Sequence, residues 1–539
     1  MQTKEELNNW IKSICEKYEN YDIKLSDLLC DSHSGKPEKT ALYFEDDAGT
    51  KQRYTFTELK ELSEKFAGVL AEKGIRKNDK VAVLLPKIPE LIIAALGIWR
   101  LGGVYVPLFT AFGPEAISHR VKNGEAKLII TNKENRPKLD SFSDSINIMV
   151  VDSSEGYDST DFDFWQELNK AEPLKQPNNV RGEDTFILLY TSGTTGLPKG
   201  VEIPVKALAS FEVYMRLGLD VREEDTFWNM ADPGWAYGLY YGVVGPLLIG
   251  KGNIFYKAPF DADAILRILR DYRVTNFASA PTAYRALRNS GISEEAKEKL
   301  QLRVCSSAGE TLNFDLVEWS KNNFGVPIYD QYGQTEVGMV VNNHHHPLLD
   351  YGSQPNSMGV PMPGYRVVVL NDSYEEAGAG EEGKMAIDTE NSPLFWFKSY
   401  FNDPDRTAKS FTDDKRYYIT GDVVSRDDNN FFYYSSRVDD IILTAGYRVS
   451  PVEVEEALLQ HDAVNDVAVV GIPDSLRGEI IKAFVELNPK YNTGEDLAKE
   501  LSNFVKKNYS AHAYPREVEF VEAIPKTPSG KKQRYLLKQ

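Results

Sequence analysis

The segment YTSGTTGLPKG, from Tyr190 to Gly200, combines glycines, hydroxylated residues and a single lysine. Glycines allow positive φ angles and a close approach of the backbone to a ligand. Successive backbone amides form a concave site for an anion, and Lys199 adds a compact positive charge. The segment differs from the Gly-x-x-x-x-Gly-Lys-Ser/Thr loop of many nucleotide-binding proteins, because a glycine follows Lys199 where a magnesium-binding hydroxyl would stand. We therefore predict a phosphate-binding loop of another kind.

The residues around this loop predict that it follows a strand of a sheet. Residues 186–190, FILLY, are apolar and predict a short buried strand that runs directly into the loop. Earlier in the chain, residues 54–74 predict an amphipathic helix with Thr57 as its N-cap, residues 80–86 a buried strand, and residues 89–103 a second helix. This alternation indicates a largely parallel sheet covered by helices, and hence an α/β fold.

The composition narrows the class of protein. A chain of 539 residues is too long for one core, and the alternation near its end predicts a small α+β domain there. The formal net charge of -18 disfavours nucleic acid and anionic membranes as partners. Three cysteines, Cys15, Cys30 and Cys305, form neither a metal-binding spacing nor a disulfide framework. Because the first residues also lack an apolar signal segment, we predict a cytoplasmic protein.

Two further segments need an interpretation. Residues 233–250 are uncharged and nearly long enough to span a bilayer, but they contain five Gly and two Pro, so we predict no membrane span and tight packing inside a globular protein. The three histidines at 344–346 point in different directions in any regular element. We therefore expect a surface loop there and no metal site.

Five more motifs follow the phosphate loop in a fixed order: SSAGETL at 306–312, YDQYGQTEVG at 329–338, YYITGDVV at 417–424, SRVDDIILTAGYRVSP at 436–451, and PKTPSGKKQR at 525–534. Together the six motifs resemble the adenylate-forming superfamily, which includes acyl-CoA synthetases, luciferases and the adenylation domains of peptide synthetases. The resemblance extends from about residue 54 to residue 534. The segments ADPGWAYG and YGQTE are most similar to the medium-chain acyl-CoA synthetase branch.

The resemblance implies a fold and a two-step reaction. Residues 1–438 would form a large adenylation domain of several subdomains, and residues 439–539 a small, mobile α+β domain that carries a catalytic lysine, Lys531. Asp439 would be the hinge. A short- to medium-chain carboxylate would attack the α-phosphorus of ATP, and the thiol of coenzyme A would then displace AMP from the acyl-adenylate. ATP, Mg²⁺ and CoA are the expected cofactors, and the chain could act as a monomer or as a homo-oligomer.

The resemblance also assigns roles to single residues. Glu336 would bind Mg²⁺, Thr335 the α-phosphate, and Lys531 the carboxylate and ribose oxygens. Tyr332 would stack on adenine, and Asp422 would accept hydrogen bonds from both ribose hydroxyls. The remaining expected contacts to the nucleotide or to CoA are Thr191, Ser192, Gly193, Thr194, Thr195, Gly196, Lys199, Gly309, Glu310, Thr311, Arg437, Gly446 and Arg448.

The acyl pocket would be lined by Trp235, Ala236, Tyr237, Ala308 and Gly333. Acetyl-specific members carry Trp at the position of Gly333, so glycine would leave room for a longer chain, and each buried methylene is worth about 0.8 kcal/mol. An aryl or branched acid remains a possible substrate, and a luciferase-like oxygenase remains an alternative activity. A third alternative, a non-catalytic nucleotide sensor, would be expected to lack Lys531 or Glu336, and the chain retains both.

Overall fold

The computed structural model describes residues 3–19, 22–35, 39–153, 161–191, 198–310, 312–349, 351–437, 440–444, 447–474, 477–508, 513–526 and 532–538. A seven-stranded sheet carries the phosphate loop and has the order β7-β6-β5-β3-β4-β8-β9. Its strands are β7 (Phe162–Asp163), β6 (Asn147–Val150), β5 (Ala126–Thr131), β3 (Lys80–Leu84), β4 (Val104–Pro107), β8 (Thr185–Thr191) and β9 (Lys199–Pro204). All pairs but β8–β9 are parallel, which confirms the predicted largely parallel sheet.

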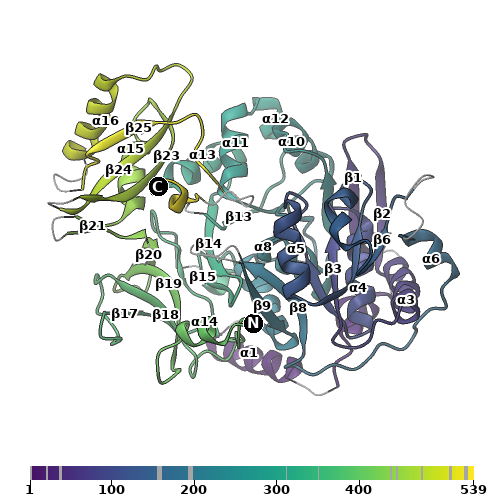
Figure 1. The fold of residues 1–539 in the computed structure, drawn as a ribbon. Coiled ribbons are helices and arrows are strands. Elements are labelled where there is room, and N and C mark those ends of the chain that lie inside the picture. The colour runs from purple at the N-terminus through teal and green to yellow at the C-terminus, as the bar shows by residue number, and fades with distance from the viewer. Residues whose placement is uncertain are drawn as a thin grey trace.

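A second sheet carries two of the predicted motifs and has the order β10-β12-β13-β14-β15-β16. Its strands are β10 (Phe227–Asn229), β12 (Asn276–Ser279), β13 (Val304–Ala308), β14 (Ile328–Gln334), β15 (Gly338–Asn342) and β16 (Val360–Pro361). The first three pairs of neighbouring strands are parallel, and the last two pairs, β14–β15 and β15–β16, are antiparallel. Three helices lie beside this sheet in Figure 1: α10 (Ala262–Asp271), α11 (Pro281–Ser290) and α13 (Phe314–Phe324). A smaller sheet, β11-β1-β2, joins β11 (Asn253–Lys257), β1 (Thr40–Asp46) and β2 (Lys51–Thr55).

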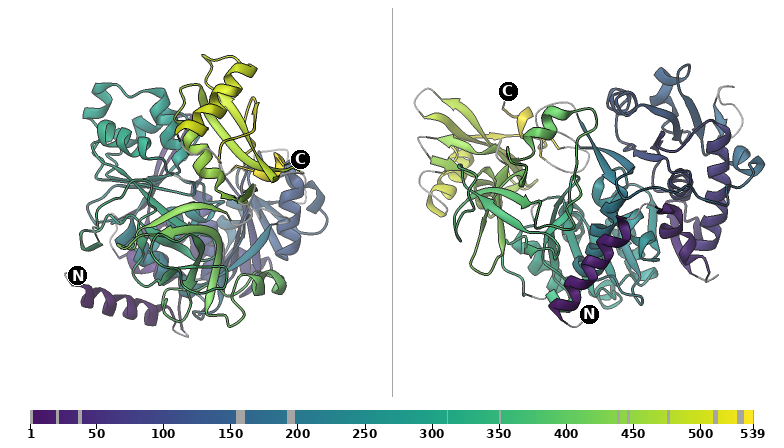
Figure 2. Two further views of the ribbon diagram at one scale, coloured as in Figure 1. Left: turned by 90° about the vertical axis from the view of Figure 1, so that its left-hand side faces the viewer. Right: turned by 90° about the horizontal axis from the view of Figure 1, so that it is seen from below.

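An antiparallel sheet precedes the C-terminal unit. It has the order β17-β18-β19-β20, with β17 (Val367–Leu370), β18 (Gly383–Asp388), β19 (Tyr417–Arg426) and β20 (Phe432–Arg437). Beyond it, a five-stranded sheet with α15 (Pro451–Leu459) and α16 (Glu495–Asn508) forms the predicted small α+β unit. Its strands are β22 (Tyr447–Val449), β21 (Ile442–Thr444), β24 (Gly478–Leu487), β23 (Val464–Asp474) and β25 (Glu517–Phe520). Figures 1 and 2 show this unit, in yellow, next to the green antiparallel sheet.

The C-terminal unit has a hydrophobic core of its own, between its sheet and its two helices. This arrangement agrees with the predicted division into a large and a small domain. The predicted boundary between residues 438 and 439 lies outside the described residues and stays a prediction.

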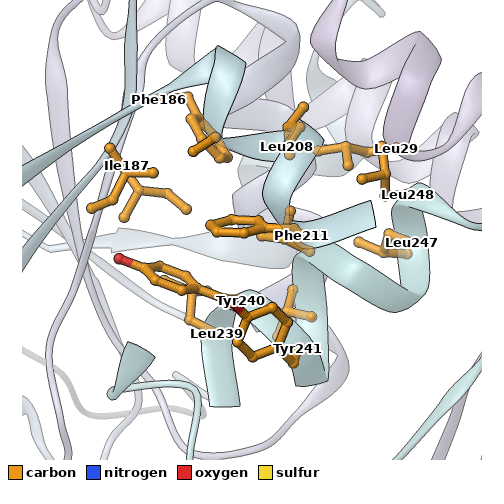
Figure 3. Close-up of a cluster of buried hydrophobic side chains, with 14 of the residues drawn as sticks. Leu29, Phe186, Ile187, Leu208, Phe211, Leu239, Tyr240, Tyr241, Leu247 and Leu248 are labelled. Atoms are coloured by element: carbon orange, nitrogen blue, oxygen red, sulfur yellow. The ribbon is translucent and has the colours of Figure 1, made fainter. Parts of the chain in front are cut away.

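The glycine-rich segment 233–250 lies in the core of the large domain. It forms α8 (Ala236–Leu239), the π-helical turn η5 (Tyr240–Val244) and α9 (Gly245–Leu248). In Figure 3 its side chains pack beside Phe211, whose ring stacks on Tyr240 with 4.5 Å between centroids. No helix among the described residues is long and apolar enough to cross a membrane. The prediction of tight internal packing is therefore confirmed.

The first predicted helix begins differently from the expectation. Helix α3 (Phe56–Glu72) follows β2 directly, and its N-cap is Thr55 rather than Thr57. The Thr55 side chain accepts from the backbone N–H of Glu58, and the Glu58 carboxylate accepts from the backbone N–H of Thr55. This reciprocal capping box satisfies two backbone donors at once, which explains why the helix starts there. The helix α4 (Pro89–Arg100) lies within its predicted range and packs against α3.

Candidate active site

The two ends of the phosphate loop lie side by side at the end of the β8–β9 hairpin. Thr191, the last residue of β8, is paired with Lys199, the first residue of β9. The hydroxyl oxygen of Thr191 is buried and has no hydrogen-bond partner in the described structure. Because a buried polar atom costs free energy unless it is paired, this hydroxyl fits a ligand oxygen at the loop. The loop residues Ser192, Gly193, Thr194, Thr195 and Gly196 lie outside the described residues.

A tyrosine connects the loop lysine to the predicted magnesium ligand. The ammonium of Lys199 donates to the hydroxyl of Tyr400 (3.1 Å), and this hydroxyl donates to Oε1 of Glu336 (2.8 Å). Tyr400 is only 4% exposed and Glu336 only 8%. We call this chain of contacts the Lys199–Tyr400–Glu336 bridge. Sequence analysis predicted the two ends of the bridge but not Tyr400.

Local backbone contacts explain the position of Tyr400. Its backbone forms an isolated antiparallel bridge with Val201 of β9, and the N–H of Phe401 donates to the carbonyl of Gly200 (2.7 Å). The hydroxyl of Thr407 accepts from the N–H of Tyr400 (2.9 Å). Tyr400 is 201 residues from Lys199, so no spacing in the sequence could have pointed to it.

Burial and neighbouring charges set the protonation of the bridge. Burial lowers the pKa of Lys199, and the carboxylate of Glu336 opposes that shift. Burial and then Glu336 raise the pKa of Tyr400, so its hydroxyl keeps its proton and donates to the carboxylate. The bridge therefore places a neutral hydroxyl between the lysine and the carboxyl group.

A second polar cluster surrounds Asp422 of β19. The hydroxyl of Tyr332 donates to its Oδ2, as does Nε2 of Gln334 (2.9 Å), while Nη1 of Arg437 donates to Oδ1 (2.8 Å). Strand register explains part of this geometry, because Asp422 and Arg437 are paired between β19 and β20. Burial alone would lower the pKa of Arg437, but Asp422 outweighs it and raises the pKa. We call these four residues the Asp422 cluster.

Gly421 is required by the packing of this cluster. Its φ is +78°, in the left-handed region, and a Cβ atom there would lie 2.8 Å from Nη2 of Arg437. Only glycine meets both conditions without strain. The Thr-Gly-Asp motif thus has a structural reason at its central position.

The predicted role of Asp422 requires an exchange of partners. A carboxylate offers about four lone-pair positions, and three side chains already donate to this one. Two ribose hydroxyls therefore cannot both bind unless one present donor leaves. Tyr332 is a candidate to leave, because its predicted partner is the adenine ring.

The two clusters are neighbours. Gln334 of the Asp422 cluster accepts at Oε1 from the hydroxyl of Tyr418 (3.2 Å), and the pKa of Tyr418 is raised by burial and then by Glu336 and Tyr400 of the bridge. The hydroxyl of Tyr240 donates to the carbonyl of Thr335 (3.0 Å), which fixes the backbone between Gln334 and Glu336. The YGQTE segment therefore serves both clusters.

The SSAGETL motif begins within β13 and continues past the end of that strand. Gly309 has a φ of +99° with open space at its Cβ position. The carboxylate of Glu310 accepts from Thr282 Oγ1 (2.7 Å) and from Arg285, so its side chain is already bound within the protein. The backbone of this segment remains the part predicted to contact adenine. Thr311 lies outside the described residues.

The predicted pocket residues pack against two different hydrophobic clusters. Trp235 packs against Phe109 and Phe112, with centroid distances of 5.4 and 5.6 Å, beside the cluster on one face of the large sheet. Ala236 and Tyr237 pack instead against the main core, where the Tyr237 hydroxyl lies 3.2 Å from that of Tyr214.

Gly333 and Ala308 are both closely packed. Ala308 is buried at the end of β13. A Cβ atom at Gly333 would lie 2.3 Å from the carbonyl oxygen of Gly338 and 2.6 Å from Sδ of Met339. The space that the missing side chain leaves is therefore filled by β15, and the close approach of the two strands explains this glycine.

The three histidines correct one expectation. His344 is buried, and burial lowers its pKa to about 4. The ring of His345 stacks on Tyr329 with 4.2 Å between centroids, and its Nε2 lies 3.1 Å from Oγ of Ser306. The prediction of a surface loop is wrong for these two residues, because the segment packs against β13 and β14. Within the described ranges, no group of three or more His, Cys, Asp or Glu could hold a metal ion.

The chemistry of the bridge fits Mg²⁺ that arrives with a nucleotide. Mg²⁺ prefers oxygen ligands and is commonly bound through one or two carboxylates together with substrate phosphates. Glu336 supplies one carboxylate beside the loop, and Tyr400 occupies only its Oε1. Arg448 lies in β22, whereas Asp439, Gly446 and Lys531 lie outside the described residues. Their predicted roles stay predictions.

Comparison with known proteins decides the family. Residues 31–400 match the model of the "AMP-binding enzyme" family, and residues 453–531 match the "AMP-binding enzyme C-terminal domain". The chain belongs to the AMP-binding enzyme family. The predicted membership of the adenylate-forming superfamily is confirmed, and so is the α/β fold with a large first and a small second domain.

Three relatives indicate the class of activity within this family. An acetyl-coenzyme A synthetase of Bacillus subtilis is 35% identical over 513 residues, which cover 94% of this chain and 88% of the relative. The mitochondrial acyl-coenzyme A synthetase ACSM3 of Homo sapiens is 34% identical, and the matched residues cover 97% of this chain and 90% of the relative. A crystal structure of a Brucella canis acyl-CoA synthetase is 42% identical, with a TM-score of 0.79, and covers 100% of this chain and 98% of its own.

These findings confirm the predicted class of enzyme, an ATP-dependent, AMP-forming acyl-CoA synthetase. Enzymes of this class use ATP, Mg²⁺ and CoA, as the sequence predicted. The identity of the acid and the roles of single residues are separate questions.

Proposed function

We propose that the protein converts a short- to medium-chain carboxylic acid into its acyl-CoA thioester through an acyl-adenylate, with the Lys199–Tyr400–Glu336 bridge and the Asp422 cluster as its nucleotide site. The observation that carries the assignment is the proximity of the two clusters. One offers a cation and a carboxylate at a phosphate loop, and the other offers a carboxylate flanked by a tyrosine and an arginine.

In the first step, the substrate carboxylate attacks the α-phosphorus of ATP and pyrophosphate leaves. Lys199 and the loop amides hold the phosphate oxygens, and Thr335 holds the α-phosphate while Asp422 orients the ribose. Bound Mg²⁺ at Glu336 would screen the charge that develops on the phosphate oxygens. Positioned cations and amides of this kind supply much of the acceleration in phosphoryl transfer. Lys531 acts in this step only.

In the second step, the thiol of CoA attacks the acyl carbon and AMP leaves. We assign this step to a second orientation of the small domain, with Asp439 as the hinge and Gly446 beside the pantetheine chain. The separate core of the small domain supports this proposal, because it allows the domain to turn as a unit. The cytoplasm is our proposed compartment, which the buried free thiols of Cys30 and Cys305 support.

The chain length of the acid is tested by pyrophosphate release. A panel of straight-chain acids from C2 to C12, with benzoate as an aryl acid, is assayed with ATP, Mg²⁺ and CoA, and the thioester is identified by mass spectrometry. We expect the highest kcat/KM for an acid between C3 and C8, and we expect one thioester for each pyrophosphate released. Activity with benzoate but with none of the straight-chain acids would contradict the proposed acid. Oxygen uptake after adenylate formation would favour a luciferase-like reaction.

A further inference from the structure

The hydroxyl of Tyr400 is placed where two groups of opposite charge would otherwise meet. It accepts from Lys199 at 3.1 Å and donates to Glu336 at 2.8 Å. Among the described residues, Lys199 and Glu336 form no direct ion pair. The lysine also lies over the tyrosine ring, 4.4 Å from its centroid. The ring and the hydroxyl therefore both separate the cation from the anion.

The backbone of Tyr400 is held to the same hairpin that carries Lys199. Its contacts with Val201 and the contact of Phe401 with Gly200 fix the ring relative to the end of the phosphate loop. The ring also packs against Phe397, with 5.0 Å between centroids. Because the tyrosine is buried and anchored at both its backbone and its ring, its hydroxyl is held in place between the two side chains.

We propose that Tyr400 is a positioning residue for the magnesium–ATP complex. Its hydroxyl holds Oε1 of Glu336 and leaves Oε2 available for a metal that would bind with the nucleotide, and it prevents Lys199 from neutralising that carboxylate directly. This inference rests on the proposed role of Glu336. Loss of the hydroxyl would let Lys199 approach Glu336, and a direct ion pair would then compete with both the metal and the phosphate for their ligands.

The chain offers a matched control for this hydroxyl. Lys17 donates to the hydroxyl of Tyr18 (2.8 Å), which donates to Oε2 of Glu212 (2.6 Å). Tyr18 is fully buried at the end of helix α1 (Lys4–Tyr18), which packs on α7 (Leu208–Val213). Figure 2 shows α1, in purple, along the outside of the molecule. Tyr18→Phe therefore removes the same atom from the same types of partner at a place with no predicted nucleotide role, where Lys17 and Glu212 are also in direct contact (3.4 Å).

The test compares Tyr400→Phe, Tyr18→Phe and the unchanged protein in nucleotide binding without any acid. Isothermal titration calorimetry measures the affinity for ATP with Mg²⁺ and with EDTA, and EPR of Mn²⁺ with ATP reports the metal directly. We expect Tyr400→Phe to weaken magnesium-dependent binding about tenfold, as for loss of a hydrogen bond to a charged group. Tyr18→Phe should change it by less than about twofold, because the hydrogen-bond partners of Tyr18 belong to neither cluster of the nucleotide site.

A third measurement separates positioning from general damage. Thioester formation from supplied acyl-adenylate and CoA needs no metal at Glu336, so Tyr400→Phe should retain it. The ratio of affinities with and without Mg²⁺ is taken within one preparation, so a partly unfolded sample does not alter it.

Three outcomes would overturn parts of this inference in distinguishable ways. An unchanged magnesium dependence in Tyr400→Phe, together with its loss in Glu336→Gln, would refute the role of Tyr400 and leave the proposed function intact. Equal losses in Tyr400→Phe and Tyr18→Phe would show a general effect on stability. Normal magnesium-dependent binding in Glu336→Gln would refute the metal site itself.

Discussion

Replacing Asp422 by asparagine removes one charge and keeps the shape of the side chain. In the present structure the carboxylate accepts from Tyr332, Gln334 and Arg437, and its side chain is 6% exposed. An asparagine would retain one acceptor oxygen and would present an NH₂ group in place of the other. If the oxygen stays with Arg437, the amide NH₂ faces the NH₂ of Gln334, and two donors then oppose each other.

The expected cost in stability follows from these contacts. The side chain of Arg437 is 31% exposed, so the loss of its charged partner is partly compensated by water and costs about 1 kcal/mol. The unsatisfied donor of Gln334 adds about 1–2 kcal/mol. The free energy of unfolding should therefore fall by about 2–3 kcal/mol. For nucleotide binding, the loss of a charged acceptor for the ribose hydroxyls should weaken AMP binding about 10- to 100-fold.

The assay needs a control with the same cost in stability and no role in binding. Asp388 of β18 is fully buried and accepts from Arg366 (2.7 Å) in the same antiparallel sheet, so Asp388→Asn provides it. Urea denaturation should show lower midpoints for both variants, and calorimetry should show weaker AMP binding for Asp422→Asn alone. Unchanged AMP affinity in Asp422→Asn, or an equal loss in Asp388→Asn, would refute the assignment of Asp422 to the ribose.

Four further changes test other parts of the site. Glu336→Gln should abolish magnesium-dependent pyrophosphate release, because a neutral amide is a poor ligand for a hard cation. Lys531→Ala should lower pyrophosphate release about 10²–10³-fold and spare thioester formation from supplied acyl-adenylate, and equal losses would contradict domain alternation. Burial raises the pKa of Asp330 to about 7, so its contribution to stability is full below pH about 4 and is lost as the pH rises through about 7; Asp330→Asn should raise the urea midpoint more at pH 8 than at pH 4. Gly333→Ala forces a methyl group onto β15 and should cost about 1–3 kcal/mol in thermal denaturation, whereas Gly35→Ala, which meets nothing within 4 Å, should cost much less.

The regular elements near the phosphate loop were largely predictable from local patterns. The apolar run at 186–190 falls within β8, and residues 80–86 contain β3. The start of α3 was not predicted correctly, because β2 (Lys51–Thr55) ends at the residue before the helix begins and no turn separates the two. The pair Thr55 and Glu58 is a capping signature that points to the observed start.

For the nucleotide site, only residues that lie within the six motifs were predicted. Asp422 and Tyr332 were assigned to the same ligand and do lie in contact. Gln334 and Tyr400 were missed, because their partners lie 88 and 64 residues away, and only the folded sheets bring them together. The error at His344 has a different origin. The directions of consecutive side chains bear on whether they can share a metal, whereas burial depends on what packs against the segment.

The contacts within the two clusters explain how a chain with a negative net charge could bind an anionic nucleotide. A formal net charge of -18 repels ATP at long range, but salt screens exposed charges beyond about 8 Å at physiological ionic strength. Attraction therefore has to come from cations inside the site. Burial disfavours the charged form of Lys199, and Glu336 opposes that effect, while Asp422 does the same for Arg437. In each case the carboxylate that favours the charged form of the cation also has a predicted role toward the nucleotide. Binding then requires Asp422 to exchange the hydroxyl of Tyr332 for a ligand, whereas Glu336 keeps the hydroxyl of Tyr400 at Oε1 and has Oε2 left for the metal.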